Sequence, residues 1–212
     1  MIKLLAVDMD GTCLDSKSKM SEKTVNALRS LSEKGIIVVP TTGRNLNCLP
    51  HRLKKENFYR YAITSNGACI FDMKEGKKIF NSCISGETAV KLLKEFKNNG
   101  FGITAQIENE YYLQGKLLSL AGRIYYGKDS ENSLTVKSIE DYIKSTQSEV
   151  EEIQLYFLHA KSKKKAKKIL ASYSNVSSAY SSIYVEIFDI NASKGIALAQ
   201  LSEPLGITKD EI

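Results

Sequence analysis

Blocks of apolar residues alternate with polar stretches along the first third of the chain, and these blocks have the lengths of strands and helices. Residues 3–7 form a short, nearly all-apolar run, which is typical of a strand buried in a parallel sheet. A helix is predicted after Ser21, which can cap it, because Val25 and Leu28 fall on one helical face and Gly35 can end it. The chain is therefore predicted to begin with a strand followed by a helix.

Two further apolar runs, at residues 36–39 and 61–64, predict the second and third strands. Between them, the polar loop at residues 41–44 leads into a predicted helix that starts at Asn45 or Leu46 and ends near Lys55. The order strand, helix, strand, helix, strand implies right-handed crossovers. The first third is thus predicted to be a Rossmann-like, doubly wound parallel sheet.

The pattern changes after about Phe80. Two strands at residues 101–107 and 110–113 are predicted to form a hairpin, and helices are predicted around residues 89–96, 139–146 and 164–173. Helices combined with hairpin-paired strands favour an α+β layer with an antiparallel sheet. The predicted organisation is a core domain of residues 1–82 and 186–212, with an α+β domain inserted at residues 83–185.

Composition indicates an ordinary globular protein. The chain has 212 residues, of which 42% are hydrophobic and 25% charged, so it can bury a real core. Its four cysteines show no C-x-x-C spacing and are typical of reduced thiols. No stretch has the length of a signal peptide's apolar region or of a membrane span, and a cytoplasmic protein is expected.

The chain is mildly basic, with 30 Lys and Arg against 24 Asp and Glu and a net charge of +6. A positive balance favours anionic ligands, among which phosphate esters and nucleic acids both qualify. The densest basic run, at residues 161–168, fits the solvated face of an amphipathic helix, and a nucleic-acid patch is the alternative. No aromatic residue is interleaved with these lysines, as a single-strand binder would require, so no nucleic-acid partner is expected. No membrane partner is expected either, because no stretch approaches the length of a membrane span.

Two carboxylates, Asp8 and Asp10, directly follow the first predicted strand, with Gly11 and Thr12 behind them. One carboxylate can attack phosphorus and be held as an acyl-phosphate, while the second protonates the leaving group. Mg²⁺ would offset the charge between carboxylate and phosphate oxygens. A strand followed by an acidic turn is the alternative interpretation.

Polar residues also follow the second and third strands and open the last helix, and all are expected at the carboxyl ends of the parallel strands. They are Thr42, Gly43, Arg44, Asn66, Gly67 and Lys194. Hydroxyl and backbone N–H groups at a helix start can hold phosphate oxygens, and an ammonium can neutralise a transferring phosphoryl group. The alternatives are a helix N-cap for Thr42 with Gly43 and a tight turn for Asn66 with Gly67.

Together these segments resemble the haloacid dehalogenase (HAD) superfamily, and within it the Cof-like phosphatases with a type IIB cap. The matching segments are residues 7–12, 42–44, 65–68 and 193–195. The resemblance implies a Mg²⁺-dependent phosphatase with Asp8 as nucleophile, Asp10 as general acid/base, and Thr42 and Lys194 orienting the phosphate. It further implies Asp8 and Asp10 as metal ligands, and Gly11, Thr12, Gly43, Arg44, Asn66 and Gly67 as substrate-binding residues.

One departure from the family concerns a fourth acidic motif, expected after the helix that Lys194 opens. The sequence ends at Ile212, about where that motif's strand is expected, so the chain is interpreted as truncated and its turnover and Mg²⁺ binding as impaired. The leading hypothesis is hydrolysis of a small phosphorylated metabolite, such as a sugar phosphate. The alternatives are a non-catalytic phosphate-binding module and a phosphomutase on the same fold.

Overall fold

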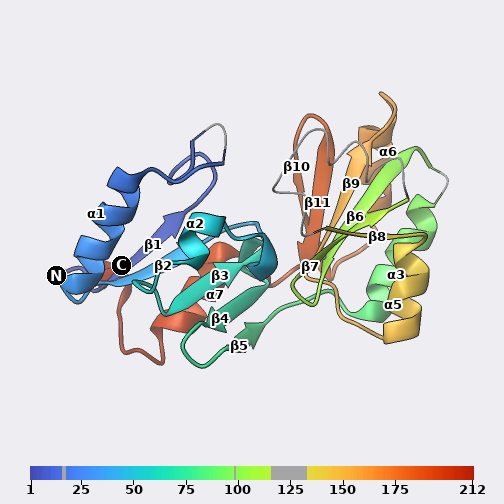
Figure 1. The fold of residues 1–212 in the computed structure, drawn as a ribbon. Coiled ribbons are helices and arrows are strands. Elements are labelled where there is room, and N and C mark those ends of the chain that lie inside the picture. Colours follow the sequence, from blue (N-terminus) through green and yellow to red (C-terminus); the bar gives the residue numbers. More distant parts are fainter. Residues whose placement is uncertain (16–17, 98, 116–132) are drawn as a thin grey trace. The chain divides into compact units, whose positions relative to one another are not determined.

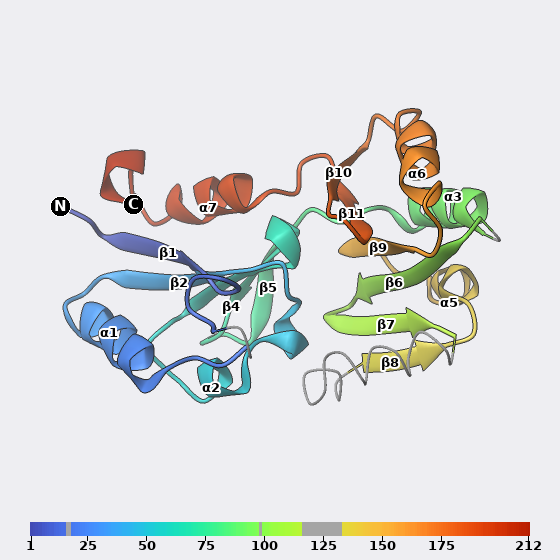
Figure 2. The same ribbon diagram turned by 90° about the horizontal axis from the view of Figure 1, so that it is seen from above.

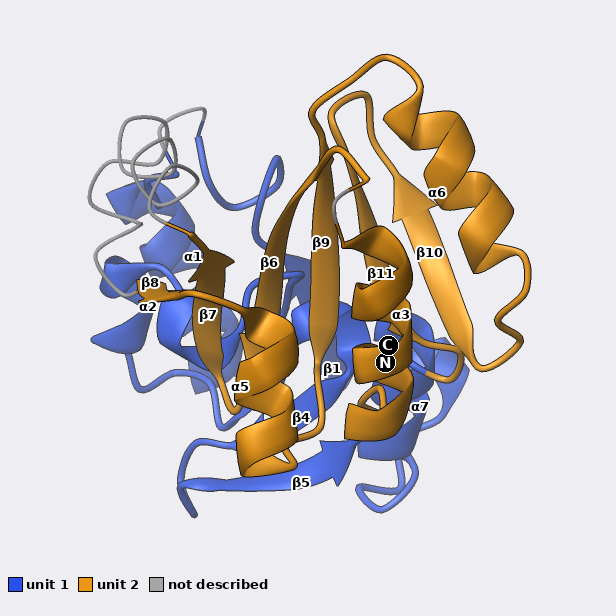
Figure 3. Ribbon diagram, turned by 90° about the vertical axis from the view of Figure 1, so that its right-hand side faces the viewer, with its two compact units in different colours: residues 1–82, 192–212 blue, residues 83–191 orange. Residues whose placement is uncertain are grey.

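The computed structural model describes residues 1–15, 18–97, 99–115 and 133–212. The chain divides into two compact units (Figure 3): unit 1 contains residues 1–82 and 192–212, and unit 2 contains residues 83–191. The predicted return to the core at residue 186 falls within strand β11, Tyr184–Asp189, which pairs with β9 and β10 of unit 2. The structure therefore places this boundary after Asn191.

Unit 1 is built on a five-stranded sheet in the order β1-β2-β3-β4-β5 (Figure 1). Its strands are β1 Leu4–Asp8, β2 Ile37–Thr41, β3 Tyr61–Thr64, β4 Cys69–Asp72 and β5 Lys77–Asn81. Its helices are α1 Glu22–Glu33, α2 His51–Lys54 and α7 Lys194–Ser202, with short 3-10 turns η1 Leu46–Cys48, η2 Ser65–Gly67 and η4 Lys209–Glu211. The first three strands are parallel, whereas β4 and β5 are antiparallel additions.

Helices cover both faces of this sheet, as a doubly wound fold requires (Figure 2). Val25 and Leu28 of α1 and Leu53 of α2 pack with one face of the sheet. Ala197 and Leu201 of α7 pack with the other. Strand residues are therefore apolar on both sides, which explains the unbroken apolar run of residues 4–7.

Local sequence signals account for the helix ends. The Ser21 hydroxyl caps α1 by accepting from the backbone N–H of Thr24 at 3.1 Å, as predicted. The single helix predicted to end near Lys55 is instead two short pieces, η1 and α2. Pro50 separates them, because proline lacks the N–H that a continuous helix needs and disfavours helical geometry in the preceding residue.

Unit 2 is a two-layer α+β structure whose six-stranded sheet has the order β10-β11-β9-β6-β7-β8. Its strands are β6 Phe101–Ile107, β7 Glu110–Gln114, β8 Ser133–Val136, β9 Glu152–Phe157, β10 Val176–Tyr180 and β11 Tyr184–Asp189. Its helices are α3 Gly86–Phe96, α5 Ile139–Thr146 and α6 Ser162–Leu170. These helices bury alternate strand residues such as Ile103 and Leu155, while Thr104 and Gln154 belong to the opposite, polar face.

The β6–β7 hairpin turns at Glu108 and Asn109, whose φ angles are 52° and 67°. Positive φ at both central residues is typical of a type I′ turn, whose twist matches that of the two flanking strands. The predicted hairpin is therefore confirmed. Among the described residues, no helix is long and apolar enough to cross a membrane.

The end of the chain is tied to the start of β1. The Lys3 backbone N–H donates to the Glu211 carbonyl at 2.7 Å, and the Lys3 ammonium lies 2.7 Å from the Glu211 carboxylate. This ammonium, together with the Thr208 backbone N–H, lowers the pKa of Glu211 from 4.5 to about 2. A depressed folded-state pKa contributes stability that is present above the unfolded-state pKa and is lost as the pH falls through the folded-state value.

We therefore expect Glu211→Gln to lower the melting temperature at pH 7 by a small, measurable amount. The difference from the wild type should narrow as the pH falls from 4.5 towards about 2, because the wild-type carboxylate then takes up its proton. Thermal unfolding of both proteins at pH 7, 4.5 and 3 measures this difference. A difference that does not change across this range would show that the ion pair is not its cause.

Candidate active site

Asp8 lies at the sheet edge where three parallel strands end together. In the parallel pairing of β1 with β2, Asp8 is opposite Thr41, and Thr41 is opposite Ile63 near the end of β3. The carboxyl ends of parallel strands share one edge, which is where open α/β sheets bind ligands. The loops after β1, β2 and β3 therefore converge there.

The loops that follow β2 and β3 are joined by two backbone hydrogen bonds. Asn66 N–H donates to the Thr42 carbonyl at 3.1 Å, and Ser65 N–H donates to the Arg44 carbonyl at 2.9 Å. Ser65 and Asn66 have left-handed φ angles of 50° and 56°, a conformation that costs roughly 1–3 kcal/mol per residue and persists where the surroundings hold it. The two hydrogen bonds help to hold it, so the loops form one fixed rim.

Lys194 begins α7 and pairs with Asp8. Its Nζ lies 2.5 Å from Asp8 Oδ1, and the side chains are 39% and 41% exposed, so both stay accessible to a ligand. The Ser193 hydroxyl fixes this helix start by accepting from Ile196 N–H at 3.0 Å. A cation in the first turn is unfavourable for the helix dipole, and the Asp8 carboxylate offsets that cost.

Gly67 packs against the start of α7. A Cβ added to Gly67 would lie 2.2 Å from the carbonyl carbon and oxygen of Ser193 and 2.6 Å from Lys194 N. Its φ is +96°, a conformation that side chains rarely allow. The bare backbone of Gly67 therefore lets the loop after β3 touch the residue that carries the ammonium.

Asp10 pairs with Arg44 across the first two loops. Arg44 Nη2 lies 2.7 Å from Asp10 Oδ1, and Nε lies 2.9 Å from Oδ2, which is a bidentate pair. Thr42 lies beside it, with its buried hydroxyl accepting from Arg44 N–H at 3.1 Å. That hydroxyl keeps its own hydrogen to donate to an anion.

The remaining predicted residues fall on the same rim of unit 1. Gly11, with φ +78°, and the exposed Thr12 form the turn after β1, where a Cβ on Gly11 would meet no atom within 4 Å. A Cβ on Gly43 would lie 3.0 Å from the Asn66 side-chain oxygen, so the Asn66 side chain of the loop after β3 lies close beside Gly43 of the loop after β2. The chemical roles of these residues stay predictions.

Two residues near the carboxylates were not predicted. Burial, and then the charge of Asp8, raise the pKa of the Cys13 thiol, which therefore stays protonated. The Ser18 hydroxyl accepts from Arg44 Nη2 at 3.1 Å. This contact joins residues that are 26 positions apart in the chain, and no local sequence pattern predicts it.

The donor set at this edge consists of hard oxygen ligands. The Asp8 side chain is 41% exposed and the main-chain carbonyl of Asp10 follows two residues later, a set of oxygens that suits a magnesium ion that keeps several of its waters. Within the described ranges, no group of three or more His, Cys, Asp or Glu residues could hold a metal ion. Proteins usually bind Mg²⁺ through one or two carboxylates together with water and substrate oxygens, and the oxygens at this edge fit that pattern.

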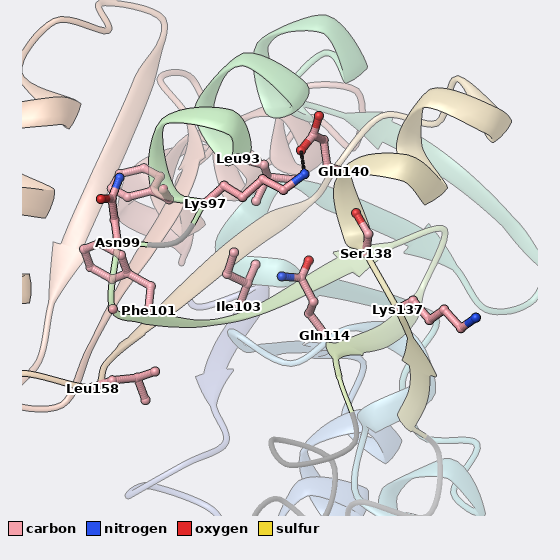
Figure 4. Close-up of a pocket in the computed structure, with 12 residues that line it drawn as sticks. Leu93, Lys97, Asn99, Phe101, Ile103, Gln114, Lys137, Ser138, Glu140 and Leu158 are labelled. Carbon is pink, nitrogen blue, oxygen red and sulfur yellow. Dashed lines mark ion pairs between the residues drawn. The ribbon is translucent and has the colours of Figure 1, made fainter.

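Unit 2 contains a cavity of about 490 Å³ that is lined by residues of this unit (Figure 4). Its lining includes the apolar side chains of Phe96 and Ile103. Figure 4 shows the Lys97 and Glu140 side chains of the lining turned towards each other. The Glu140 carboxylate is paired with Lys144 and Lys97, and the Lys144 ammonium in particular lowers the pKa of Glu140. Glu140 is the one carboxylate among the described residues that line this cavity, so the lining offers no pair of acids like Asp8 and Asp10 of unit 1.

The fold and the site define a Rossmann-like α/β protein with an acidic strand end and an inserted α+β unit. Residues 5–212 match the family model of the haloacid dehalogenase-like hydrolases. A putative phosphatase from Buchnera aphidicola subsp. Baizongia pistaciae is 30% identical over 98% of this chain and 77% of its own. The chain belongs to the haloacid dehalogenase-like hydrolase family.

Solved structures agree in fold. A haloacid dehalogenase-like hydrolase from Bacteroides thetaiotaomicron superposes with a TM-score of 0.83 at 19% identity, over all of this chain and 80% of that one. A subclass IIB sugar phosphatase of the superfamily gives a TM-score of 0.79 at 18% identity, over 99% of this chain and 78% of that one. These two structures confirm the predicted fold class. The family model and the Buchnera relative confirm the family resemblance and a phosphatase as the kind of enzyme.

Proposed function

We propose that the protein is a Mg²⁺-dependent phosphomonoester hydrolase that works through an aspartyl-phosphate on Asp8. The observation that carries this proposal is the position of Asp8 at the end of β1, with the Lys194 ammonium 2.5 Å away. A lysine beside a carboxylate lets an anionic phosphate approach that carboxylate, because it neutralises part of the combined negative charge.

In the first step, an Asp8 oxygen forms a bond to phosphorus as the bond from phosphorus to the ester oxygen breaks. Asp10 gives a proton to the departing oxygen. In the second step, Asp10 takes a proton from a water molecule whose oxygen bonds to phosphorus as the bond from phosphorus to the Asp8 oxygen breaks, which releases phosphate and restores the Asp8 carboxylate. Thr42 and Lys194 hold the phosphate oxygens throughout.

Asp8 and the main-chain carbonyl of Asp10 would hold the magnesium ion. When bound, Mg²⁺ offsets the charge that builds up between the phosphate and the carboxylate. The proposed substrate is a small phosphorylated metabolite such as a sugar phosphate. Support comes from the fold shared with a sugar phosphatase and from the relative described as a putative phosphatase.

The test is release of inorganic phosphate from p-nitrophenyl phosphate and from a panel of sugar phosphates, with Mg²⁺ and with EDTA. We expect turnover that requires the metal. Tight phosphate binding without release of phosphate from any ester would instead identify a binding module. Turnover that is unchanged in EDTA would contradict the metal requirement.

A further inference from the structure

Arg44 holds the carboxylate of Asp10 in one orientation through two parallel hydrogen bonds. Nη2 and Nε contact Oδ1 and Oδ2 at 2.7 Å and 2.9 Å. The Arg44 side chain is 19% exposed, whereas that of Asp10 is 54% exposed. The guanidinium is thus the enclosed partner, and the carboxylate is the partner that faces solvent.

Arg44 is itself fixed at several points. Its backbone N–H donates to the Thr42 hydroxyl at 3.1 Å, and its carbonyl accepts from Ser65 N–H at 2.9 Å. Its side chain donates to the Cys48 carbonyl at 3.4 Å and to the Ser18 hydroxyl at 3.1 Å. The guanidinium is therefore a preorganised support that is tied to the loops after β2 and β3.

Asp10 needs such a support because it lies in the exposed turn after β1, next to Gly11 with φ +78°. A group that transfers a proton must lie within a fraction of an ångström of its productive position. A planar guanidinium fixes both the position and the plane of a carboxylate, which a lysine ammonium does not.

From this geometry we infer that Arg44 is the positioning residue for Asp10 and not a direct ligand of the substrate phosphate. This inference rests on the proposed function, in which Asp10 gives a proton to the departing oxygen as the phosphorus–oxygen bond breaks. It departs from the substrate-binding role that the family resemblance implies for Arg44. Ser18 supports the same guanidinium from the loop before α1.

If Arg44 positions Asp10, the loss of activity on replacing Arg44 should depend on the leaving group of the ester. If Arg44 binds the substrate phosphate directly, the loss should be the same for every ester. The p-nitrophenolate of p-nitrophenyl phosphate leaves as a stabilised anion and needs little help from an acid, whereas an alkoxide needs a proton. The value of kcat/KM reports the steps up to loss of the leaving group, so it measures that help. General acid catalysis typically contributes 10²–10⁴-fold.

The experiment compares kcat/KM of the wild type, Arg44→Ala, Arg44→Lys and Asp10→Asn for p-nitrophenyl phosphate and glycerol phosphate. We expect Arg44→Ala to lose on the order of 10²-fold on glycerol phosphate and only a few-fold on p-nitrophenyl phosphate, with KM little changed. Asp10→Asn should show the same dependence on the leaving group, and Arg44→Lys should recover only part of the loss.

Arg60→Ala is the matched control, because Arg60 also pairs with an aspartate, Asp72, through Nε and Nη2. This control should leave the ratio between the two esters unchanged. NMR measurement of how slowly the Arg44 Nε–H exchanges with solvent reports whether Arg44 and Asp10 are hydrogen-bonded, and it does so independently of turnover. Slow exchange should be present in the wild type and lost in Asp10→Asn.

An equal loss on both esters with a raised KM would overturn the inference and make Arg44 a phosphate ligand. An unprotected Arg44 Nε–H in the wild type would overturn it as well. A wild type that hydrolyses neither ester while Arg44 Nε–H is protected would instead overturn the proposed function, and with it a catalytic purpose for the pair.

Discussion

Replacing Asp8 by asparagine is expected to reduce phosphate release on the order of 10³-fold or more. An amide is a poor nucleophile towards phosphorus, so the acyl-phosphate cannot form at this position. The substitution preserves the size of the side chain and its place at the end of β1. Loss of activity would therefore report chemistry and not loss of the fold.

The measurement is kcat with p-nitrophenyl phosphate at saturating Mg²⁺, together with circular dichroism to show that the variant is folded. Asp210→Asn is the matched control, because Asp210 is an exposed carboxylate of the same unit in the 3-10 turn η4. This control should keep its activity. An Asp8→Asn variant that retains more than about a tenth of the wild-type rate would contradict the nucleophile assignment.

A second measurement addresses the covalent intermediate directly. Brief incubation of the wild type with a labelled phosphate ester, followed by acid quenching, should leave label on the protein. Hydroxylamine should remove that label, since it cleaves acyl-phosphates. Asp8→Asn should take up no label, and label retained by this variant would assign the nucleophile elsewhere.

The parts of the fold that were predictable from the sequence are those set by local chemistry. Ser21 and Ser193 cap their helices because a hydroxyl before an apolar helical face satisfies a free N–H. Glu108 and Asn109 form the predicted hairpin turn because the apolar runs on either side are strands of suitable length. Such signals lie within a few residues of one another in the chain.

The parts that were not predictable depend on long-range pairing. The sequence predicts the return to the core domain at residue 186, whereas β11 pairs with β9 and β10 and therefore belongs to unit 2. The bidentate contact between Asp10 and Arg44 spans 34 residues. Both residues were identified as chemically important, but no sequence pattern states that they touch each other.

Replacing Gly67 by alanine is expected to lower both stability and activity strongly, although Gly67 has no side chain to take part in the chemistry. In Gly67→Ala the new Cβ would lie 2.2 Å from the Ser193 carbonyl. This carbonyl belongs to the backbone, which cannot move out of the way as the end of a flexible side chain could. The left-handed φ of +96° adds strain of roughly 1–2 kcal/mol, and overpacking of this kind costs about 1–3 kcal/mol more. The loop after β3 and the start of α7 must then move apart.

That movement would displace Lys194, whose ammonium lies 2.5 Å from Asp8. A misplacement of about 1 Å in a positioning group can cost on the order of 10²-fold in rate. We therefore expect Gly67→Ala to lower both the melting temperature and kcat/KM, the latter by at least about tenfold. Thermal unfolding and steady-state kinetics on the same preparation measure both effects.

Gly76→Ala is the control that separates backbone strain from collision. Gly76 also has a positive φ, +62°, but a Cβ there would meet no atom within 4 Å. It should cost only the roughly 1–2 kcal/mol of left-handed strain and should leave kcat/KM unchanged. If Gly67→Ala behaved like Gly76→Ala in both measurements, the close approach of Gly67 to α7 would not be what sets the position of Lys194.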